Sequence, residues 1–234
     1  MANSSIYNTL FSGVKRGGGK NDISDVLSLI VSKKEFFILT FANLIAQLGI
    51  TYYIMEKTTV ANKSAINFWF LFGIQIVIIF ILALVPMPSW MKFILFCAFS
   101  YSFGLLLANL KSKYDPAMIT SAILGTISIF GVMLACGAIL IMTGIKLGLQ
   151  FGLGLLFALL LLIIVRIVFM FIPASSGMKR YITIFSLALF SVYIIYDTNR
   201  ILQRNYFGDF ITASLDYYLD ILNIFVNMLS YNNN

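Results

Sequence analysis

Two apolar runs decide the fold: Tyr193-Ile-Ile-Tyr-Asp-Thr-Asn-Arg200 and Asp216-Tyr-Tyr-Leu-Asp-Ile-Leu-Asn-Ile-Phe225. Each run carries an acid in apolar surroundings, Asp197 in the first and Asp220 in the second. An aspartate at the middle of a membrane helix costs roughly 2.5–3.5 kcal/mol on insertion scales, and such residues are functional by default. We therefore take these two carboxyl groups as the candidate chemistry of the protein.

The rest of the chain has the composition of a polytopic membrane protein. Of its 234 residues, 60% are hydrophobic and 11% charged, and the mean hydropathy is +0.95, whereas soluble domains carry about 25% charged residues. Several runs hold about 20 apolar residues, enough for a helix to cross the hydrocarbon core, and none shows the short alternation of barrel strands. We expect an all-α bundle of seven transmembrane helices, over residues 36–55, 66–85, 91–110, 117–142, 148–172, 181–202 and 211–230.

These spans divide the chain into a polar basic tail (1–34), a transmembrane domain (35–230) and a short polar tail (231–234). No room remains for a soluble catalytic domain, so we expect no enzyme. The net charge of +7 predicts no nucleic-acid site, because the basic residues lie in short flanks that set topology and contact anionic headgroups.

Counting basic flanks predicts that the N-terminus is cytoplasmic, because cytoplasmic loops carry an excess of Lys and Arg. With the N-terminus in the cytoplasm, nine basic residues lie on the cytoplasmic side of the membrane and six on the opposite side. The inner nine are Lys15, Arg16, Lys20, Lys33, Lys34, Lys92, Lys146, Arg200 and Arg204, and the outer six are Lys57, Lys63, Lys111, Lys113, Lys179 and Arg180.

Cofactor and metal chemistry of the usual kinds is not expected. Cys97 and Cys136 both lie in apolar runs and are interpreted as buried hydrophobic residues. Histidine is absent, which removes the usual zinc sites. Proton sensing near neutral pH would therefore fall to carboxyl groups.

Glycines recur in the fourth and fifth spans at Gly125, Gly131, Gly137, Gly148 and Gly152. Small residues let helices approach closely in lipid, so these positions predict helix packing rather than a binding site.

In the last span, Asp216, Asp220, Asn223 and Asn227 are spaced by four, three and four residues and so form one polar stripe. A helix that is polar on one stripe turns it toward the bundle interior or a wet path. Asp216 could instead be a headgroup-level residue at a helix start.

The two candidate acids could meet, because spans six and seven are joined by a short loop. Counted from the inner ends of their spans, their heights differ by roughly 6 Å, which tilt could absorb. Two carboxyl groups in a low dielectric would share one proton and form a closed latch. Deprotonated, they would repel, open, and offer oxygens for transient Ca²⁺ binding, with Asn223 as a further ligand.

Each supporting residue also has a structural interpretation. Asp197 could pair with Arg200 one turn later, and Arg166, embedded in span five, could be a counter-ion to an aspartate or extend to the membrane surface.

The paired motifs resemble those of a known family. Tyr196-Asp-Thr-Asn-Arg-Ile201 followed by Ala213-Ser-Leu-Asp-Tyr-Tyr-Leu-Asp-Ile-Leu-Asn-Ile-Phe225 is similar to the last two spans of the Bax inhibitor, or transmembrane Bax-inhibitor-motif, family, which includes Golgi anti-apoptotic proteins. The seven-span count, the short N-terminal tail and Ser102-Phe-Gly104 in span three fit as well.

The resemblance implies a bundle with its last helix central that acts as a pH-sensitive calcium leak of endoplasmic reticulum or Golgi membranes and restrains cell death. It makes Asp197 and Asp220 the family's di-aspartyl sensor, and it implies death-pathway or calcium-channel membrane proteins as partners. One departure concerns gating: some members carry charged residues in or after span two, whereas residues 66–88 here contain no charge. Arg200 or Arg166 is then the candidate counter-charge.

Two alternatives from other classes remain open. A non-conducting scaffold could suppress cell death by binding partner proteins. An intramembrane aspartyl protease also needs two aspartates on adjacent spans, and Tyr206-Phe-Gly-Asp209 hints at its second motif. However, Asp209 lies in the connecting loop, position 206 is not glycine, and no Pro-Ala-Leu motif follows.

Overall fold

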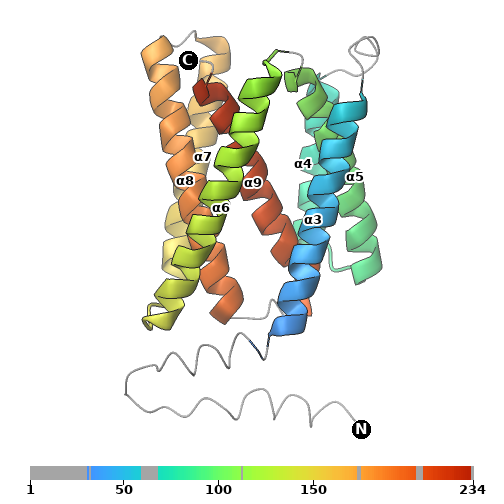
Figure 1. The fold of residues 1–234 in the computed structure, drawn as a ribbon, viewed down its shortest axis with the longest axis vertical. Helices are drawn as coiled ribbons and strands as arrows, with labels where there is room; N and C mark the ends of the chain where they lie inside the picture. Colours follow the sequence, from blue (N-terminus) through green and yellow to red (C-terminus); the bar gives the residue numbers. More distant parts are fainter. Residues whose placement is uncertain are drawn as a thin grey trace.

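The computed structural model describes residues 31, 33–58, 68–111, 113–172, 175–203 and 208–232. This part of the chain forms seven helices and no strand (Figure 1): α3 (Lys34–Lys57), α4 (Phe68–Leu84), α5 (Ser89–Lys111), α6 (Pro116–Met142), α7 (Leu149–Phe171), α8 (Ser176–Gln203) and α9 (Phe210–Asn232). Most of the expected N-terminal tail, and the last two residues of the C-terminal one, lie outside the described residues.

The predicted all-α bundle of seven spans is confirmed in class and in element order. Six helices begin within two residues of the expected position, because the apolar runs are bounded by polar or proline residues. The exception is α8, which begins at Ser176 rather than near Tyr181. Its first turn is stabilised by Ser175, whose Oγ accepts a hydrogen bond from the Met178 amide at 3.3 Å.

Five helices are long and apolar enough to cross a membrane by length and composition: α3, α5, α6, α7 and α8. The apolar helix α4 is shorter, at 17 residues. Helix α9 has 23 residues but carries the polar stripe of Asp216, Asp220, Asn223 and Asn227. Because α9 is surrounded by other helices, it can be more polar than a helix that faces lipid.

Helix α9 is the central element of the bundle. It contacts α3, α5, α6 and α8, and it runs obliquely between them (Figure 1). Buried residues recur along its length and include the fully enclosed Tyr217, Tyr218 and Ile224. By contrast, α4 contacts α5 and both α4 and α7 expose large apolar side chains, as expected for lipid-facing helices.

A row of buried polar residues on α3 forms hydrogen bonds with α9 and α5. The row consists of Asn43, Gln47 and Thr51, which lie one helical turn apart on the inner face of α3. Asn43 Nδ2 donates to Ser214 Oγ at 2.5 Å, and Thr51 Oγ1 lies 2.5 Å from the Tyr218 hydroxyl. Between them Gln47 Oε1 accepts a hydrogen bond from Ser100 Oγ of α5 at 2.8 Å. Such bonds replace the water that polar groups lose in the membrane.

The glycine prediction is confirmed at three of the five positions. A Cβ atom added at Gly125, Gly137 or Gly152 would lie 2.5 Å, 2.7 Å or 2.3 Å from an atom of a neighbouring helix, so these residues permit close packing. At Gly131 and Gly148 it would meet nothing within 4 Å, and packing does not explain those two glycines.

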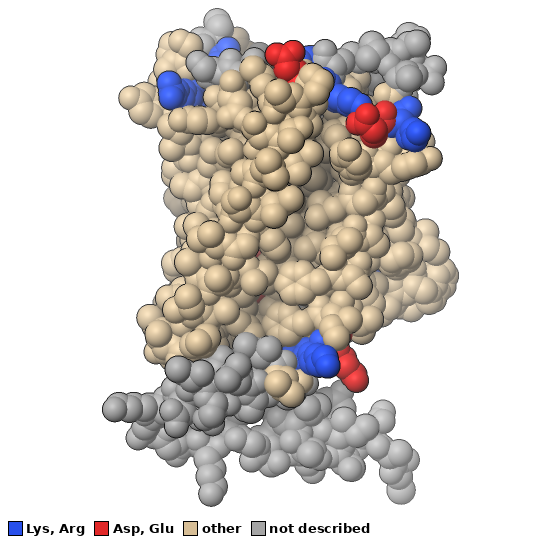
Figure 2. Space-filling view, viewed as in Figure 1, with Lys and Arg blue, Asp and Glu red and all other residues tan. Residues whose placement is uncertain are grey.

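Charged residues gather at the two ends of the molecule, with an uncharged band between them on the face shown in Figure 2. We call the end at which α3 begins the N-side and the end at which α9 finishes the C-side. The band matches the pattern of a protein embedded in lipid, with ionic groups at the headgroup levels.

Candidate functional site

The two aspartates singled out by the sequence come together between α8 and α9. Asp197 is 5% exposed and Asp220 is 4% exposed. A side-chain hydrogen bond links their carboxyl groups. Since an ionised carboxylate can only accept, such a bond requires that one of the two acids carries a proton.

The two carboxyl groups meet although their positions along α8 and α9 differ. Asp197 lies six residues before the end of α8 and Asp220 ten residues after the start of α9, a difference of about 6 Å along a straight helix at 1.5 Å per residue. Helix α9 crosses the bundle obliquely (Figure 1), and the hydrogen bond between the two carboxyl groups shows that these residues meet as predicted.

Charges around the pair are unevenly matched. Arg200, on α8, acts on Asp197 as a favourable positive charge, whereas Asp216, on α9, places a further carboxyl group near both acids. The Asp220 Oδ2 atom is buried and has no hydrogen-bond partner among the described residues. An unpaired buried carboxyl oxygen is unfavourable, so this atom is available to a proton or a cation.

A neutral hydrogen bond lies beside the acid pair. Thr198 Oγ1, one residue after Asp197, is 2.9 Å from the Tyr217 hydroxyl on α9. The Tyr217 ring is completely buried and stacks on Phe41 of α3 at a centroid distance of 5.9 Å. It also meets Phe130 of α6 edge to face at 5.4 Å. This packing fixes the α9 side of the site against three helices.

Side chains at the end of α8 form hydrogen bonds with the turn between α6 and α7. Asn199 Oδ1 accepts a bond from the Leu147 amide at 2.8 Å, and Asn199 Nδ2 donates to the Ile145 carbonyl at 2.9 Å. Gln203 Nε2 adds a bond to the Leu147 carbonyl at 3.1 Å. These roles of Asn199 and Gln203 could not be read from the sequence, because their partners lie more than fifty residues away in the chain.

The connection from α8 to α9 is held by a charge cluster on the N-side. Asp209 forms an ion pair with Lys92 of α5 and caps α9 by accepting the Thr212 amide at 3.0 Å and the Thr212 hydroxyl at 2.7 Å. Partial burial opposes ionisation of Asp209, but the bonds from Lys92 and Thr212 outweigh it, and the pKa of this carboxyl is lowered. Asp209 followed by an apolar run is a helix-start signal that could have identified this cap.

Lys33 performs the complementary role at the end of α8. Its Nζ donates to the Leu202 carbonyl at 2.6 Å, which supplies a cation at the negative end of the helix dipole. Partial burial lowers the pKa of Lys33 to about 8. The sequence identified this lysine as part of the inner basic flank but did not indicate its contact with α8.

The supporting residues Arg166, Asn223 and Asn227 form hydrogen bonds to groups other than the acid pair. Arg166 Nη2 donates to Ser186 Oγ at 2.9 Å and to Asn227 Oδ1 at 2.6 Å, which joins α7, α8 and α9 nearer the C-side. Asn223 Nδ2 donates to the Leu219 carbonyl of its own helix at 2.7 Å. The polar stripe of α9 thus continues past the acids and ends at Arg166.

No group of three or more histidine, cysteine, aspartate or glutamate side chains within the described ranges is arranged to hold a metal ion. Bound calcium usually has six to eight oxygen ligands, many of them carboxylate.

Comparisons with known proteins agree with the motifs of α8 and α9. A family model described as inhibitor of apoptosis-promoting Bax1 matches residues 33–233. The chain is 26% identical to an uncharacterised protein of Campylobacter jejuni over 226 residues, 97% of this chain and 96% of that protein. It is 29% identical to Bax inhibitor 1 of Schizosaccharomyces pombe over 164 residues, 69% of this chain and 60% of the yeast protein. A BI1-like protein of Arabidopsis thaliana is 35% identical over 68 residues, 29% of this chain and 27% of that protein.

Proposed function

This chain belongs to the Bax inhibitor family, and we propose that it is a pH-sensitive calcium leak channel that modulates calcium stores and inhibits apoptosis, with Asp197 and Asp220 as its gate. The observation that carries the proposal is the hydrogen bond between two buried carboxyl groups on adjacent helices. The anti-apoptotic role rests on the family and on the relative named Bax inhibitor 1.

The gate works through one shared proton. While the proton is present, the hydrogen bond between the acids holds α8 against α9. When it leaves, two negative charges face each other, and their repulsion amounts to about 4 kcal/mol for unit charges about 4 Å apart at an effective dielectric constant of about 20. Arg200 moderates this repulsion and Asp216 adds to it.

Calcium would meet oxygen ligands at the opened pair. The unpartnered Asp220 Oδ2 and the released Asp197 carboxylate are hard anionic ligands, which suit Ca²⁺. Few fixed ligands favour weak binding, and weak binding lets a permeant ion leave again. No resident cofactor enters this scheme.

The setting of the proposed channel is an intracellular membrane, the endoplasmic reticulum or the Golgi, with the N-side facing the cytoplasm. This orientation rests on the count of basic residues in the sequence, whose excess comes mainly from Lys15, Arg16 and Lys20 in the N-terminal tail. Death-pathway or calcium-channel membrane proteins are the proposed partners.

Calcium flux from liposomes tests the gate. Purified protein is reconstituted with an internal calcium dye, and flux is measured from pH 5 to pH 8 for the wild type, Asp220→Asn and Asp197→Asn. An amide can keep one hydrogen bond to the remaining carboxylate at every pH, so we expect each variant to lose the rise of flux with pH.

The control is Asp115→Asn, which removes an exposed carboxylate at the start of α6, far from the pair in sequence and on the C-side. If the Asp220→Asn variant shows the same calcium flux as the wild type, the gate is contradicted and a non-conducting scaffold is favoured. Cleavage of a peptide by the same vesicles, blocked by an aspartyl protease inhibitor, would instead favour a protease. Asp209 is unsuited to that role, since it is engaged by Lys92 and Thr212.

A further inference from the structure

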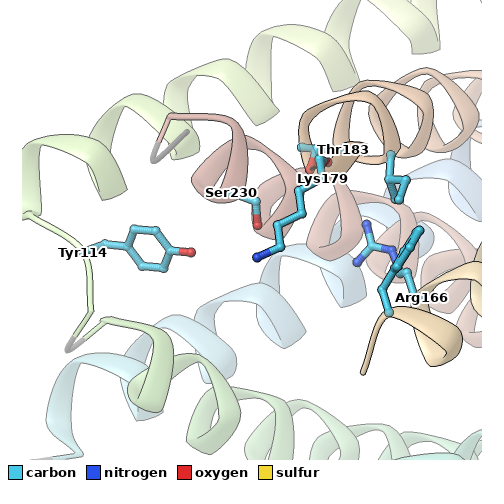
Figure 3. Close-up of a pocket in the computed structure, with 7 residues that line it drawn as sticks. Tyr114, Arg166, Lys179, Thr183 and Ser230 are labelled. Atoms are coloured by element: carbon cyan, nitrogen blue, oxygen red, sulfur yellow. Dashed lines mark hydrogen bonds between the residues drawn. The ribbon is translucent and has the colours of Figure 1, made fainter. Parts of the chain in front are cut away.

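A pocket of about 300 Å³ opens on the C-side, away from the acid pair. It lies between the start of α8, the end of α9, the upper part of α7 and the loop before α6 (Figure 3). Its lining consists of Tyr114, Arg166, Phe169, Lys179, Ile182, Thr183 and Ser230, and none of these residues is acidic. We propose that this pocket binds a phosphate group.

Arg166 supplies the inner donors of the proposed site. Both of its hydrogen bonds, to Ser186 and Asn227, leave from Nη2. The N–H groups on Nε and Nη1 have no hydrogen-bond partner within the described part of the chain. The guanidinium is thus held in place on one side and open on the other, an arrangement suited to a planar bidentate contact with phosphate oxygens.

Lys179 and Tyr114 supply the outer donors. In Figure 3 the ammonium of Lys179 points into the space between the Tyr114 phenol and the Arg166 guanidinium. Neither Lys179 nor Arg166 forms an ion pair with a described acid, in contrast to Lys92 and Lys111, which do. Two cations facing one cavity repel each other, and an anion between them relieves that repulsion.

The hydroxyl groups of Thr183 and Ser230 can only accept hydrogen bonds from a ligand, because their own protons are donated to the backbone. Thr183 Oγ1 donates its proton to the Lys179 carbonyl at 3.0 Å and Ser230 Oγ to the Val226 carbonyl at 3.0 Å. Their oxygens remain as secondary acceptors at the cavity, so a protonated phosphate oxygen also finds a partner there.

The depth of the pocket agrees with the headgroup level of a membrane. Arg166 lies five residues, or about 7.5 Å, before the end of α7, and Lys179 lies in the first turn of α8. Phe169 and Ile182 give the cavity an apolar wall. A phospholipid would place its phosphate on the cations and its glycerol end on that wall. Free phosphate shares the first contact but gains nothing from the second.

Native mass spectrometry of the full chain in phosphate-free detergent tests the proposal and separates the two sources. The probes are phosphatidylglycerol, diacylglycerol with the same acyl chains, and inorganic phosphate. We expect phosphatidylglycerol to bind and diacylglycerol, which lacks the phosphate, to bind at least about tenfold more weakly, because a hydrogen bond to a charged group contributes about 1.5–3 kcal/mol. Binding of inorganic phosphate alone would assign the site to the free anion.

Matched variants locate the binding. Lys179→Gln should weaken phosphate binding about tenfold and Tyr114→Phe about threefold, whereas Lys113→Gln, which removes the same charge from the same end outside the pocket, should change it less than about twofold. Equal losses in Lys179→Gln and Lys113→Gln would overturn the proposal in favour of diffuse surface attraction. So would the absence of binding by every phosphate-bearing probe.

A second measurement needs no variant and does not rest on channel activity. Acetylation of wild-type Lys179 by an amine reagent, read by peptide mass spectrometry, should slow about fivefold or more when the phosphate-bearing ligand is present. Acetylation of Lys113 should not change. Equal rates at Lys179 with and without ligand would contradict a phosphate in this pocket.

Discussion

The Tyr217 hydroxyl on α9 lies 2.9 Å from Thr198 Oγ1 on α8, so a neutral hydrogen bond joins the same two helices as the acid pair. Thr198 follows Asp197 directly in the chain, and Tyr217 lies three residues before Asp220. Protonation does not change this bond near neutral pH. It therefore opposes separation of α8 and α9 throughout this pH range, whereas the link between the acids depends on the shared proton.

Tyr217→Phe should shift the pH at which calcium flux rises. The variant removes one buried hydrogen bond, which contributes about 1 kcal/mol to the closed arrangement. Less repulsion is then needed to open the pair, so the midpoint of flux should move down by about 0.7 pH unit, since one unit corresponds to about 1.4 kcal/mol. Liposome flux measures the shift, and Tyr52→Phe on the exposed face of α3 is the control. A midpoint that rises would contradict the closed, protonated latch.

Gly137→Ala should destabilise the fold by about 1–3 kcal/mol through overpacking. The new Cβ would lie 2.7 Å from both the Ile195 carbonyl oxygen and Thr198 Cβ, which α8 cannot avoid without moving. Thermal unfolding in detergent measures the loss. Gly131→Ala is the matched control on the same helix, because its Cβ enters open space and alanine favours helix by up to about 1 kcal/mol. Equal melting temperatures for the two variants would show that α6 and α8 pack less closely than described.

Asn199→Ala should destabilise the protein by about 1–3 kcal/mol, because it removes both side-chain bonds to the turn between α6 and α7. Proteolysis of that turn should also become faster, since the Ile145 carbonyl and the Leu147 amide lose their partner. Limited digestion followed by mass spectrometry checks the site of cleavage. Thr120→Ala, which removes an exposed hydroxyl bonded only within α6, should leave the turn as resistant as in the wild type.

Asp209→Asn should change the response of stability to acid. Because the pKa of Asp209 is lowered in the folded protein, its ionised form adds stability that is fully present above the unfolded pKa of about 4 and is lost as the pH falls through the lower folded value. Wild-type protein should therefore lose stability from about pH 5 downward more steeply than Asp209→Asn. Melting temperatures from pH 3 to pH 7 test this, and parallel curves would contradict a stabilising role for the pair with Lys92.

The sequence predicted the helices well because lipid imposes a simple length rule. Each apolar run of about 20 residues became a helix, and proline or charged residues marked its limits. The start of α8 was missed because Met178, Lys179 and Arg180 have the composition of a loop, although they form its first turns. The cap by Ser175 is a short-range signal that could have corrected the boundary.

The candidate site was only partly predictable. Helical periodicity placed Asp220 and Asn227 on the buried stripe of α9, and the short connection to α8 made a meeting with Asp197 plausible. By contrast, the contact of Lys33 with the end of α8 and the hold of Asn199 on a distant turn depend on which helices become neighbours. No pattern within one helix encodes that choice.

Three hydrogen bonds from Asn199 and Gln203 connect the end of α8 to the α6–α7 turn, so the proposed gating motion would have to involve that turn. If the lower half of α8 swings outward when the acids separate, it either breaks three hydrogen bonds or carries the turn at residues 145–147 with it. In the second case loss of a proton deep in the bilayer would displace Lys146 at the water boundary.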